Sequence, residues 1–510
     1  MSRTWRFLTS AFFTYVYQAA LLVTGLWMAP FLLHRLGQHD YGVWLVGFQI
    51  LSYLILLDFG VIAVVPREVA HLTGRARALG TTPEISSLVA DTARVVLYQI
   101  PVVLLAAAAI WMFVPASWQV YRGVLGLILI AFVVAFPLRI FAALLEGLQD
   151  FAYIGGMNLC ALALGTTVTV VSVLKGYGLY ALPLNWATMQ GVIIAASMYR
   201  ITRRFPETLP RRLPPIARST LFRFLSRGFW VSLNQVAQPM LSSSDMMVVG
   251  KLGGATAVVP YNATGKLIGV LGNQPQVLML SAIPGLSELK TGATREHTYR
   301  VTTALSLAVL LLCGAIVAVV LAVNQGFVSR WLGPAQYSGI TLTALVGTAL
   351  LLRQWNLINQ FSTFCFGHER RITITVFVDG LVTCAASIFF VWFLGPVGGP
   401  LGSILGVCLI SLPLNLKALG QETGASRASL VKPLWPWFWR FIALVTCILL
   451  VTRILRPTTI AEIALTAAAV LLVYCLFMWP VAMRSSLGVY LNRMLAAIRM
   501  RTFAKAVPVA

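Results

Sequence analysis

The chain is divided into apolar runs of the length that a helix needs to cross a lipid bilayer. A crossing helix takes about 20 apolar residues. We place such spans near residues 11–33, 43–65, 93–114, 122–145, 153–174, 178–199, 229–250, 257–284, 301–323, 339–361, 372–393, 398–417, 437–455 and 461–482. Charged residues make up 10% of the chain, whereas a soluble domain carries about a quarter. The pattern predicts an all-α, multi-pass membrane protein with 14 transmembrane helices.

The basic residues are distributed unevenly between the two sides of the predicted membrane. With the N-terminus in the cytoplasm, 29 of the 38 Lys and Arg residues fall on the cytoplasmic side and 7 on the outer side. Cytoplasmic loops of membrane proteins carry such an excess of Lys and Arg. We therefore expect both termini to be cytoplasmic and the net charge of +23 to face anionic membrane lipids. Nucleic acid is not needed to explain this charge.

A basic segment separates two groups of predicted spans. Residues 201–228 are rich in Pro and Arg and are interpreted as a cytoplasmic linker. Residues 1–200 before it and 229–417 after it each hold six spans, and residues 418–510 hold two further spans and a basic cytoplasmic tail. The sequence thus predicts two six-helix bundles followed by two extra transmembrane helices.

The two predicted bundles share spacings. Asp58 lies 21 residues after Gly37, and Gln274 lies 21 residues after Gly253. These matches indicate two parallel repeats, with coincidence among common residues as the alternative. Transporters are often built from repeats, with a binding site near the middle of the membrane beside interrupted helices.

Polar side chains inside the predicted spans are the candidate site. A charge at a helix centre costs roughly 2.5–3.5 kcal/mol, so such groups usually face protein or water. We expect a polar cavity lined by Gln18, Asp58, Arg139, Asn234, Asp245, Lys266, Asn273, Gln274, Arg353 and Asp379, with hinges at Gly60, Gly272 and Pro275. For Arg139 and Asp379 a purely structural ion pair remains an equal alternative. The cations Arg139 and Lys266 would suit an anionic group such as a pyrophosphate.

Motifs for other chemistry do not occur in the sequence. It contains no phosphate-binding G-x-x-x-x-G-K-[ST] loop and no H-E-x-x-H metal motif, and its seven cysteines are scattered without a C-x-x-C pair. We therefore expect no catalytic residues, no metal and no bound cofactor, while coupling to protons or sodium stays open. The chain is not expected to be an enzyme.

Four short motifs resemble one family of transporters. They are Leu36-Gly37 with Tyr41-Gly42, Leu57-Asp58-Phe59-Gly60, Leu145-Glu146-Gly147-Leu148-Gln149, and Trp331-Leu332-Gly333-Pro334 with Tyr337. Together they are similar to the polysaccharide transporter and O-antigen flippase family. That family belongs to the multidrug/oligosaccharidyl-lipid/polysaccharide exporter superfamily, which also holds multidrug-and-toxin extrusion proteins and lipid II flippases.

The resemblance implies two pseudo-symmetric bundles around a central cavity. It implies an alternating-access flippase in the bacterial inner membrane that moves an undecaprenyl-pyrophosphate-linked oligosaccharide for lipopolysaccharide or other surface polysaccharide biosynthesis. A glycan polymerase and glycosyltransferases would be its working partners. Related lipid flippases carry cavity arginines in the first helix of each bundle, whereas this chain has Gln18 there. The two extra helices would form a lipid groove with the core.

Two other functions remain open. A cation-coupled multidrug antiporter would use Asp58 or Asp245 as its proton or sodium site. A membrane glycan polymerase or ligase would need a sizeable outer loop with catalytic side chains. The predicted outer loops are short, and their only acids are Asp40 and Glu462, so this alternative ranks below the others.

Overall fold

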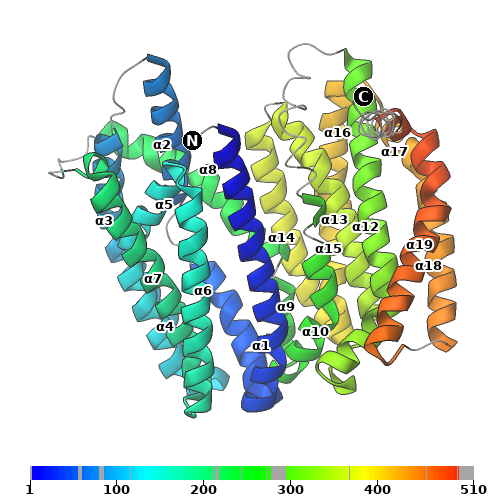
Figure 1. Ribbon diagram of the computed structural model, residues 1–510, viewed down its shortest axis with the longest axis horizontal. Helices are drawn as coiled ribbons and strands as arrows, with labels where there is room; N and C mark the ends of the chain where they lie inside the picture. Colours follow the sequence, from blue (N-terminus) through cyan, green and yellow to red (C-terminus); the bar gives the residue numbers. More distant parts are fainter. Residues whose placement is uncertain are drawn as a thin grey trace, which may run out of the picture. The chain divides into compact units, whose positions relative to one another are not determined.

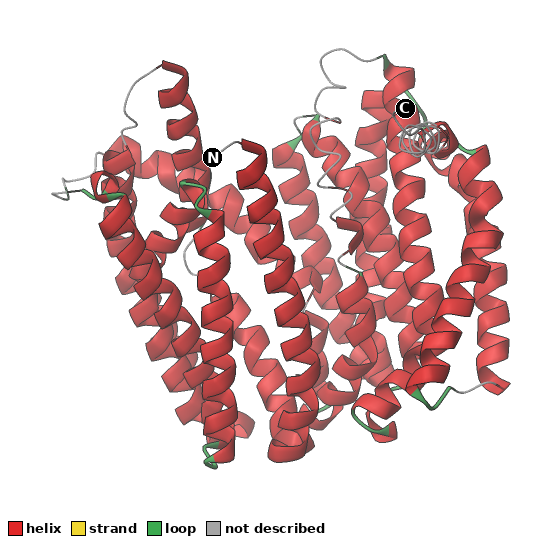
Figure 2. Ribbon diagram, in the orientation of Figure 1, coloured by secondary structure: helices red, strands yellow, loops and turns green. Residues whose placement is uncertain are grey.

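The computed structural model is built of helices throughout the part that it describes (Figure 2). The described residues are 3–54, 60–79, 85–114, 116–210, 213, 218–242, 244–272, 274–276, 279, 286, 294–366, 368–454, 457–490 and 492. They form α-helices, short 3₁₀ turns and one π-helical stretch, with no strand among them. Lipid offers no hydrogen-bond partners, so a spanning segment must satisfy its own backbone groups, as a helix does. The predicted all-α class is confirmed.

The chain divides into two compact units, Met1–Pro239 and Met240–Ala510. Unit 1 contains α1 (Arg3–Leu54), α2 (Val61–Leu79), α3 (Ile85–Met112), α4 (Arg122–Ala135), α5 (Arg139–Gly147), α6 (Phe151–Leu174), α7 (Ala181–Arg204) and most of α8 (Arg218–Ser242). Helix α8 therefore begins inside the segment predicted as a linker. Pro239, inside α8, is the last residue of unit 1.

Unit 2 carries the remaining helices (Figure 1). They are α9 (Ser244–Leu252), α10 (Ala255–Leu271), α12 (Arg295–Trp331), α13 (Ile340–Cys365), α14 (Glu369–Leu394), α15 (Gly398–Gly406), α16 (Leu412–Thr423), α17 (Arg427–Val431), α18 (Trp435–Ile454) and α19 (Ile460–Arg484). A π-helical stretch, Val407–Ser411, joins α15 to α16.

Within the described ranges, nine helical segments are long and apolar enough to cross a membrane. Two of them, Tyr15–Leu54 and Arg370–Thr423, each cover two of the predicted spans. Three predicted spans, 229–250, 257–284 and 339–361, are not among the nine and correspond to α8 with α9, to α10, and to α13. The nine segments are thus consistent with the fourteen predicted spans.

A glycine turn divides α1 into two helices. Gly37 has φ 80° and ψ 169°, which interrupts the helix that spans Arg3–Leu54. Gly254, the residue before α10, has nearly the same backbone angles, φ 82° and ψ 162°. A positive φ of this kind is open to glycine and costly for other residues. A sharp glycine turn of this kind therefore occurs in both units, and the one in unit 2 before α10 lies one residue beyond the predicted match Gly253.

Small residues bring α14 and α15 close together. Gly398, Gly402 and Gly406 recur every four residues along α15, so they lie on one face of the helix. A Cβ at Gly398 would lie 2.2 Å from the main chain of Phe390, and one at Gly402 would lie 2.1 Å from Ser387 Oγ. Membrane helices use such small-residue faces to pack closely. The motif sets the distance between two helices that carry polar side chains.

The last two helices pack on α12 of unit 2 (Figure 1). Tyr474 on α19 donates a hydrogen bond to the main-chain oxygen of Leu311 on α12, at 2.8 Å. Trp437 Nε1 on α18 donates to the Tyr474 hydroxyl at 3.2 Å, and both rings cover Gly314. The two appended helices are thus joined to the core by hydrogen bonds as well as by apolar packing.

Candidate functional site

Arg353 on α13 and Asp379 on α14 form an ion pair inside unit 2. Arg353 Nη1 donates to Asp379 Oδ2 at 2.6 Å, and Arg353 Nη2 donates to Asp379 Oδ1 at 3.1 Å. The Asp379 side chain is fully buried, and 17% of the Arg353 side chain is exposed. This two-point geometry matches the planar guanidinium to the carboxylate and is the stronger form of such a pair.

Neighbouring hydroxyl groups complete the pair. Thr383 Oγ1 donates to Asp379 Oδ1 at 3.0 Å, and Ser411 in the π-helical stretch donates to Asp379 Oδ2. Arg353 also donates to Ser403 on α15, through Nε to its hydroxyl and through Nη2 to its carbonyl, both at 3.0 Å. Four hydrogen bonds fill the roughly four acceptor positions of a carboxylate. The cluster joins α13, α14, α15 and the π-helical stretch and has the geometry of a structural ion pair, which was one of the two alternatives for Asp379.

Asp245 lies in the first turn of α9, and the groups that donate hydrogen bonds to its carboxylate differ from those around Asp379. The Tyr261 hydroxyl on α10 donates to Asp245 Oδ2, and the Met246 main-chain N–H donates to Asp245 Oδ1 at 2.8 Å. Helix α15 covers this contact closely, since a Cβ at Gly399 would lie 2.8 Å from the Tyr261 oxygen and 3.2 Å from Asp245 Cβ. No cationic side chain within the described part of the chain pairs with Asp245.

The chemistry of Asp245 therefore differs from that of Asp379. Asp245 accepts two hydrogen bonds of about four that a carboxylate can take. Its negative charge lies in a helix bundle without a compensating cation among the described residues. Such an acid within apolar helices is usually functional, because its charge must be met by a proton, a cation or a ligand.

Lys266 on α10 is a further charge of unit 2 for which the described residues provide no partner. It lies within α10, Ala255–Leu271, and is partly buried. Its ammonium group makes no hydrogen bond and no ion pair to any residue that the structure describes. Of the two cations predicted inside spans of unit 2, Arg353 is therefore neutralised by Asp379 and Lys266 is not.

Helix α10 ends at one of the predicted hinges. Gly272 caps the helix, and its carbonyl accepts a hydrogen bond from Gln354 Nε2 on α13 at 2.9 Å. Pro275 is buried and Gln274 is exposed. The contact with Gln354 ties the end of α10 to α13, and Lys266 lies two turns or less before this end.

The described predicted site residues of unit 1 lie on three separate helices. Gln18 on α1 is exposed, and Arg139 at the start of α5 is partly buried. Asn234 on α8 is partly buried, and its Oδ1 is enclosed without a hydrogen-bond partner among the described residues. Gly60 has φ 69° and precedes α2. Asp58 and Asn273 lie outside the described residues.

Several polar residues of unit 2 were not selected from the sequence. They are Tyr261, Thr383, Ser403 and Ser411. Thr383 follows Asp379 by four residues on one helix, a spacing that places side chains together and could have been used to find it. The other three lie on helices separate from the charge that they contact, so no local spacing indicates them.

Comparisons with solved structures identify the fold. A structure of the lipid II flippase MurJ in an inward closed conformation is similar with a TM-score of 0.63 and 10% identity, over 93% of this chain and 99% of that one. The Vibrio cholerae MATE transporter VcmN is similar with a TM-score of 0.54 and 13% identity, over 82% of this chain and 96% of that one. An inward-facing multidrug resistance MATE family transporter of the MOP superfamily is similar with a TM-score of 0.53 and 14% identity, over 82% of this chain and 96% of that one.

No protein-family model and no curated protein sequence matches the chain. The structural likeness shows that the chain has the fold of MOP superfamily transporters, which are multi-pass membrane proteins. The three solved structures are those of two transporters and a flippase.

Proposed function

We propose that this protein is an alternating-access flippase for a lipid-linked oligosaccharide in the bacterial inner membrane. Its substrate would be an undecaprenyl-pyrophosphate-linked glycan that is moved between leaflets for surface polysaccharide biosynthesis. The observation that carries the proposal is Lys266, an ammonium group within a helix of unit 2 that has no described anionic partner. A pyrophosphate supplies the negative charge that this position lacks.

The extent of the structural likeness supports a lipid substrate. The MurJ structure aligns with 93% of this chain, whereas the two MATE structures align with 82%. The chain thus shares more of its length with the lipid II flippase than with the two MATE transporters. The motifs in the first helices and around Trp331 point to the same class of substrate.

The proposal is tested by measuring glycan translocation in proteoliposomes. The probe is a fluorescently labelled polyprenyl-pyrophosphate disaccharide, and its exposure on the outer leaflet is read by a membrane-impermeant quencher. Lys266→Ala is expected to slow translocation at least about tenfold, the effect of losing one charge-assisted contact. Lys266→Arg keeps the charge and is expected to retain most of the activity.

A matched control separates this effect from a general loss of positive charge. Lys251 is an exposed lysine in the last turn of α9, and Lys251→Ala is expected to translocate at the rate of the unmodified protein. Equal rates for Lys266→Ala and the unmodified protein would remove the basis of the proposal.

Asp245 favours a second candidate, a cation-coupled multidrug antiporter. A buried carboxylate held by Tyr261 without a described cation could bind a proton, sodium or a cationic drug. Deletion of the gene distinguishes the two functions. Loss of surface glycan supports the flippase, whereas increased drug sensitivity with unchanged surface glycan supports the antiporter.

A further inference from the structure

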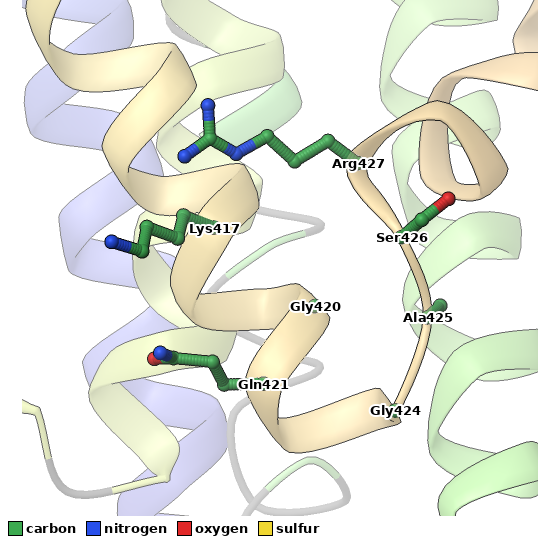
Figure 3. Close-up of a pocket in the computed structure, with 7 residues that line it drawn as sticks. All are labelled: Lys417, Gly420, Gln421, Gly424, Ala425, Ser426 and Arg427. Carbon is green, nitrogen blue, oxygen red and sulfur yellow. The ribbon is translucent and has the colours of Figure 1, made fainter.

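A hollow lies where the core of unit 2 is connected to the last two helices (Figure 3). It has a volume of about 510 Å³ and is lined by Lys417, Gly420, Gln421, Gly424, Ala425, Ser426 and Arg427. We call it the α16–α17 hollow. Lys417, Gln421 and Arg427 extend to the same side in Figure 3, and all three are exposed.

A third cation borders this hollow from another helix. The Arg295 side chain, at the start of α12, lies against Gly424, since a Cβ on this glycine would be 3.4 Å from Arg295 Cδ and 3.7 Å from Nη1. Residues far apart in the sequence therefore bring Arg295, Lys417 and Arg427 to one place. The predicted topology puts this end of α12 and α16 on the cytoplasmic side.

The acidic side chains described on the same helices are engaged elsewhere. Glu296 on α12 pairs with Arg300, and Glu422 on α16 pairs with His368 at 2.7 Å. Arg295, Lys417 and Arg427 have no acidic partner in the described part of the chain. The α16–α17 hollow thus carries an uncompensated positive charge beside an amide donor, Gln421. Guanidinium and ammonium groups arranged in this way suit a phosphate.

The walls of the hollow are fixed by packing. Gly424 has φ 70° in the left-handed region and ends α16, and Gly420 lets the Ala425 carbonyl approach, since a Cβ would lie 2.6 Å from it. The Tyr299 hydroxyl on α12 donates to the Ser429 carbonyl on α17 at 2.9 Å. Ser426 Oγ is already used, because it accepts the Ser429 N–H at 3.1 Å. The cations are therefore held on a rigid support before any ligand binds.

Exposed aromatic rings place the hollow at the level of lipid headgroups. Trp435 and Trp439, in the first turns of α18, are 53% and 55% exposed, and their ring centroids are 5.5 Å apart. Exposed tryptophans gather where the membrane meets water. The α16–α17 hollow precedes this aromatic pair directly in the chain, which favours a position of its cations near the lipid phosphates.

We propose that the α16–α17 hollow binds the phosphate headgroup of an anionic phospholipid in the cytoplasmic leaflet. The bound lipid would stabilise the junction through which α18 and α19 are attached to the core. This site is separate from Lys266 and does not depend on the proposed transport activity. The pyrophosphate of a lipid-linked substrate shares the same chemistry and is distinguished by the test.

The test measures binding of fluorescent phosphatidylglycerol to the full-length protein in a neutral detergent. The triple variant Arg295→Gln, Lys417→Gln, Arg427→Gln is expected to bind at least about tenfold more weakly, as for the loss of a charge-assisted contact. The control triple variant Arg203→Gln, Arg204→Gln, Lys432→Gln removes three exposed charges outside the hollow and is expected to bind normally. Equal weakening in both variants would overturn the proposal.

Two further measurements keep the result decisive. Arg427→Lys retains the charge but lacks the planar guanidinium that can bind a phosphate through two hydrogen bonds. It should weaken binding less than the triple variant does while leaving helix content unchanged. Competition with inorganic pyrophosphate and with a polyprenyl-pyrophosphate disaccharide identifies the source of the phosphate. Unlabelled phosphatidylglycerol is expected to displace the fluorescent lipid. Millimolar amounts of either pyrophosphate compound are expected to leave the fluorescent lipid bound. Preferential displacement by a pyrophosphate compound would overturn the assignment to phospholipid.

Discussion

The guanidinium of Arg353 and the carboxylate of Asp379 meet in a two-point contact between α13 and α14, with the carboxylate fully enclosed. Hydroxyl groups from Thr383, Ser403 and Ser411 surround the two charges. The contact explains how unit 2 holds a charged pair among apolar helices, because each charge is met by the other.

Removing one member of this pair should destabilise unit 2 strongly. Asp379→Asn leaves the Arg353 charge without its partner, which typically costs about 3–5 kcal/mol. The double variant Arg353→Met, Asp379→Leu should recover part of this loss, because it removes both charges. Thermal unfolding in detergent measures the effect.

The Arg200–Asp150 pair in unit 1 provides the control. Its nitrogen and oxygen are 2.8 Å apart, but 25% and 18% of the side chains are exposed. Asp150→Asn should therefore cost much less than Asp379→Asn, near the value of about 1 kcal/mol for accessible pairs. Equal losses in the two variants would contradict the structural role of Asp379.

Asp245 should determine any ion dependence of transport. Asp245→Asn keeps the size of the side chain and removes its charge, so we expect transport to become insensitive to sodium or proton gradients. Tyr261→Phe removes one hydrogen bond to the carboxylate and should shift the ion concentration at half-maximal rate without abolishing the dependence. Transport in proteoliposomes with imposed gradients measures both. An unchanged gradient dependence in Asp245→Asn would exclude this residue as the coupling site.

Close packing of α14 and α15 should not tolerate one added methyl group. In Gly402→Ala the new Cβ would lie 2.1 Å from Ser387 Oγ and 2.5 Å from its main-chain nitrogen. Such overpacking typically costs about 1–3 kcal/mol. Gly191→Ala on α7 is the matched control, because a Cβ there meets nothing within 4 Å. The control should leave the unfolding temperature unchanged or raise it, and the same drop in both variants would contradict this packing.

The Tyr474 hydroxyl should stabilise the attachment of α18 and α19. Tyr474→Phe keeps the ring and removes the hydrogen bonds with Leu311 and Trp437. The expected cost is about 1–3 kcal/mol, because the buried Trp437 N–H loses its acceptor. Tyr177 is 56% exposed, and Tyr177→Phe should have no measurable effect. Limited proteolysis between α18 and α19 and thermal unfolding report the difference.

The predicted orientation can be tested by labelling single cysteines in a variant that lacks the seven native ones. A cysteine at Thr458, before α19, should react with a membrane-impermeant maleimide on intact spheroplasts. A cysteine at Arg204, in the last turn of α7, should react only after lysis. The reason is the excess of Lys and Arg on the side predicted to be cytoplasmic. Labelling of Arg204→Cys in intact spheroplasts would reverse the topology.

The sequence by itself determined the class of fold and the approximate positions of the helices. Runs of apolar residues long enough to span a bilayer leave helices as the main solution, because each backbone group must be satisfied within its own segment. The break inside α1 was also predicted, because the apolar runs 11–33 and 43–65 are separate and Gly37 lies between them. These features depend on neighbouring residues in the chain and on the solvent around them.

Only the tertiary structure decided what each intramembrane charge does. In the sequence, Asp245, Lys266, Arg353 and Asp379 are each a charge in an apolar run, and their partners cannot be identified from it. In the structure, Arg353 forms an ion pair with Asp379, and the Tyr261 hydroxyl donates a hydrogen bond to Asp245. Lys266 has no partner among the described residues. The structure also brings Arg295 to the end of α16. Which side chains on different helices meet depends on how each helix is rotated and packed. The hydropathy pattern along the chain does not specify these interhelical partners.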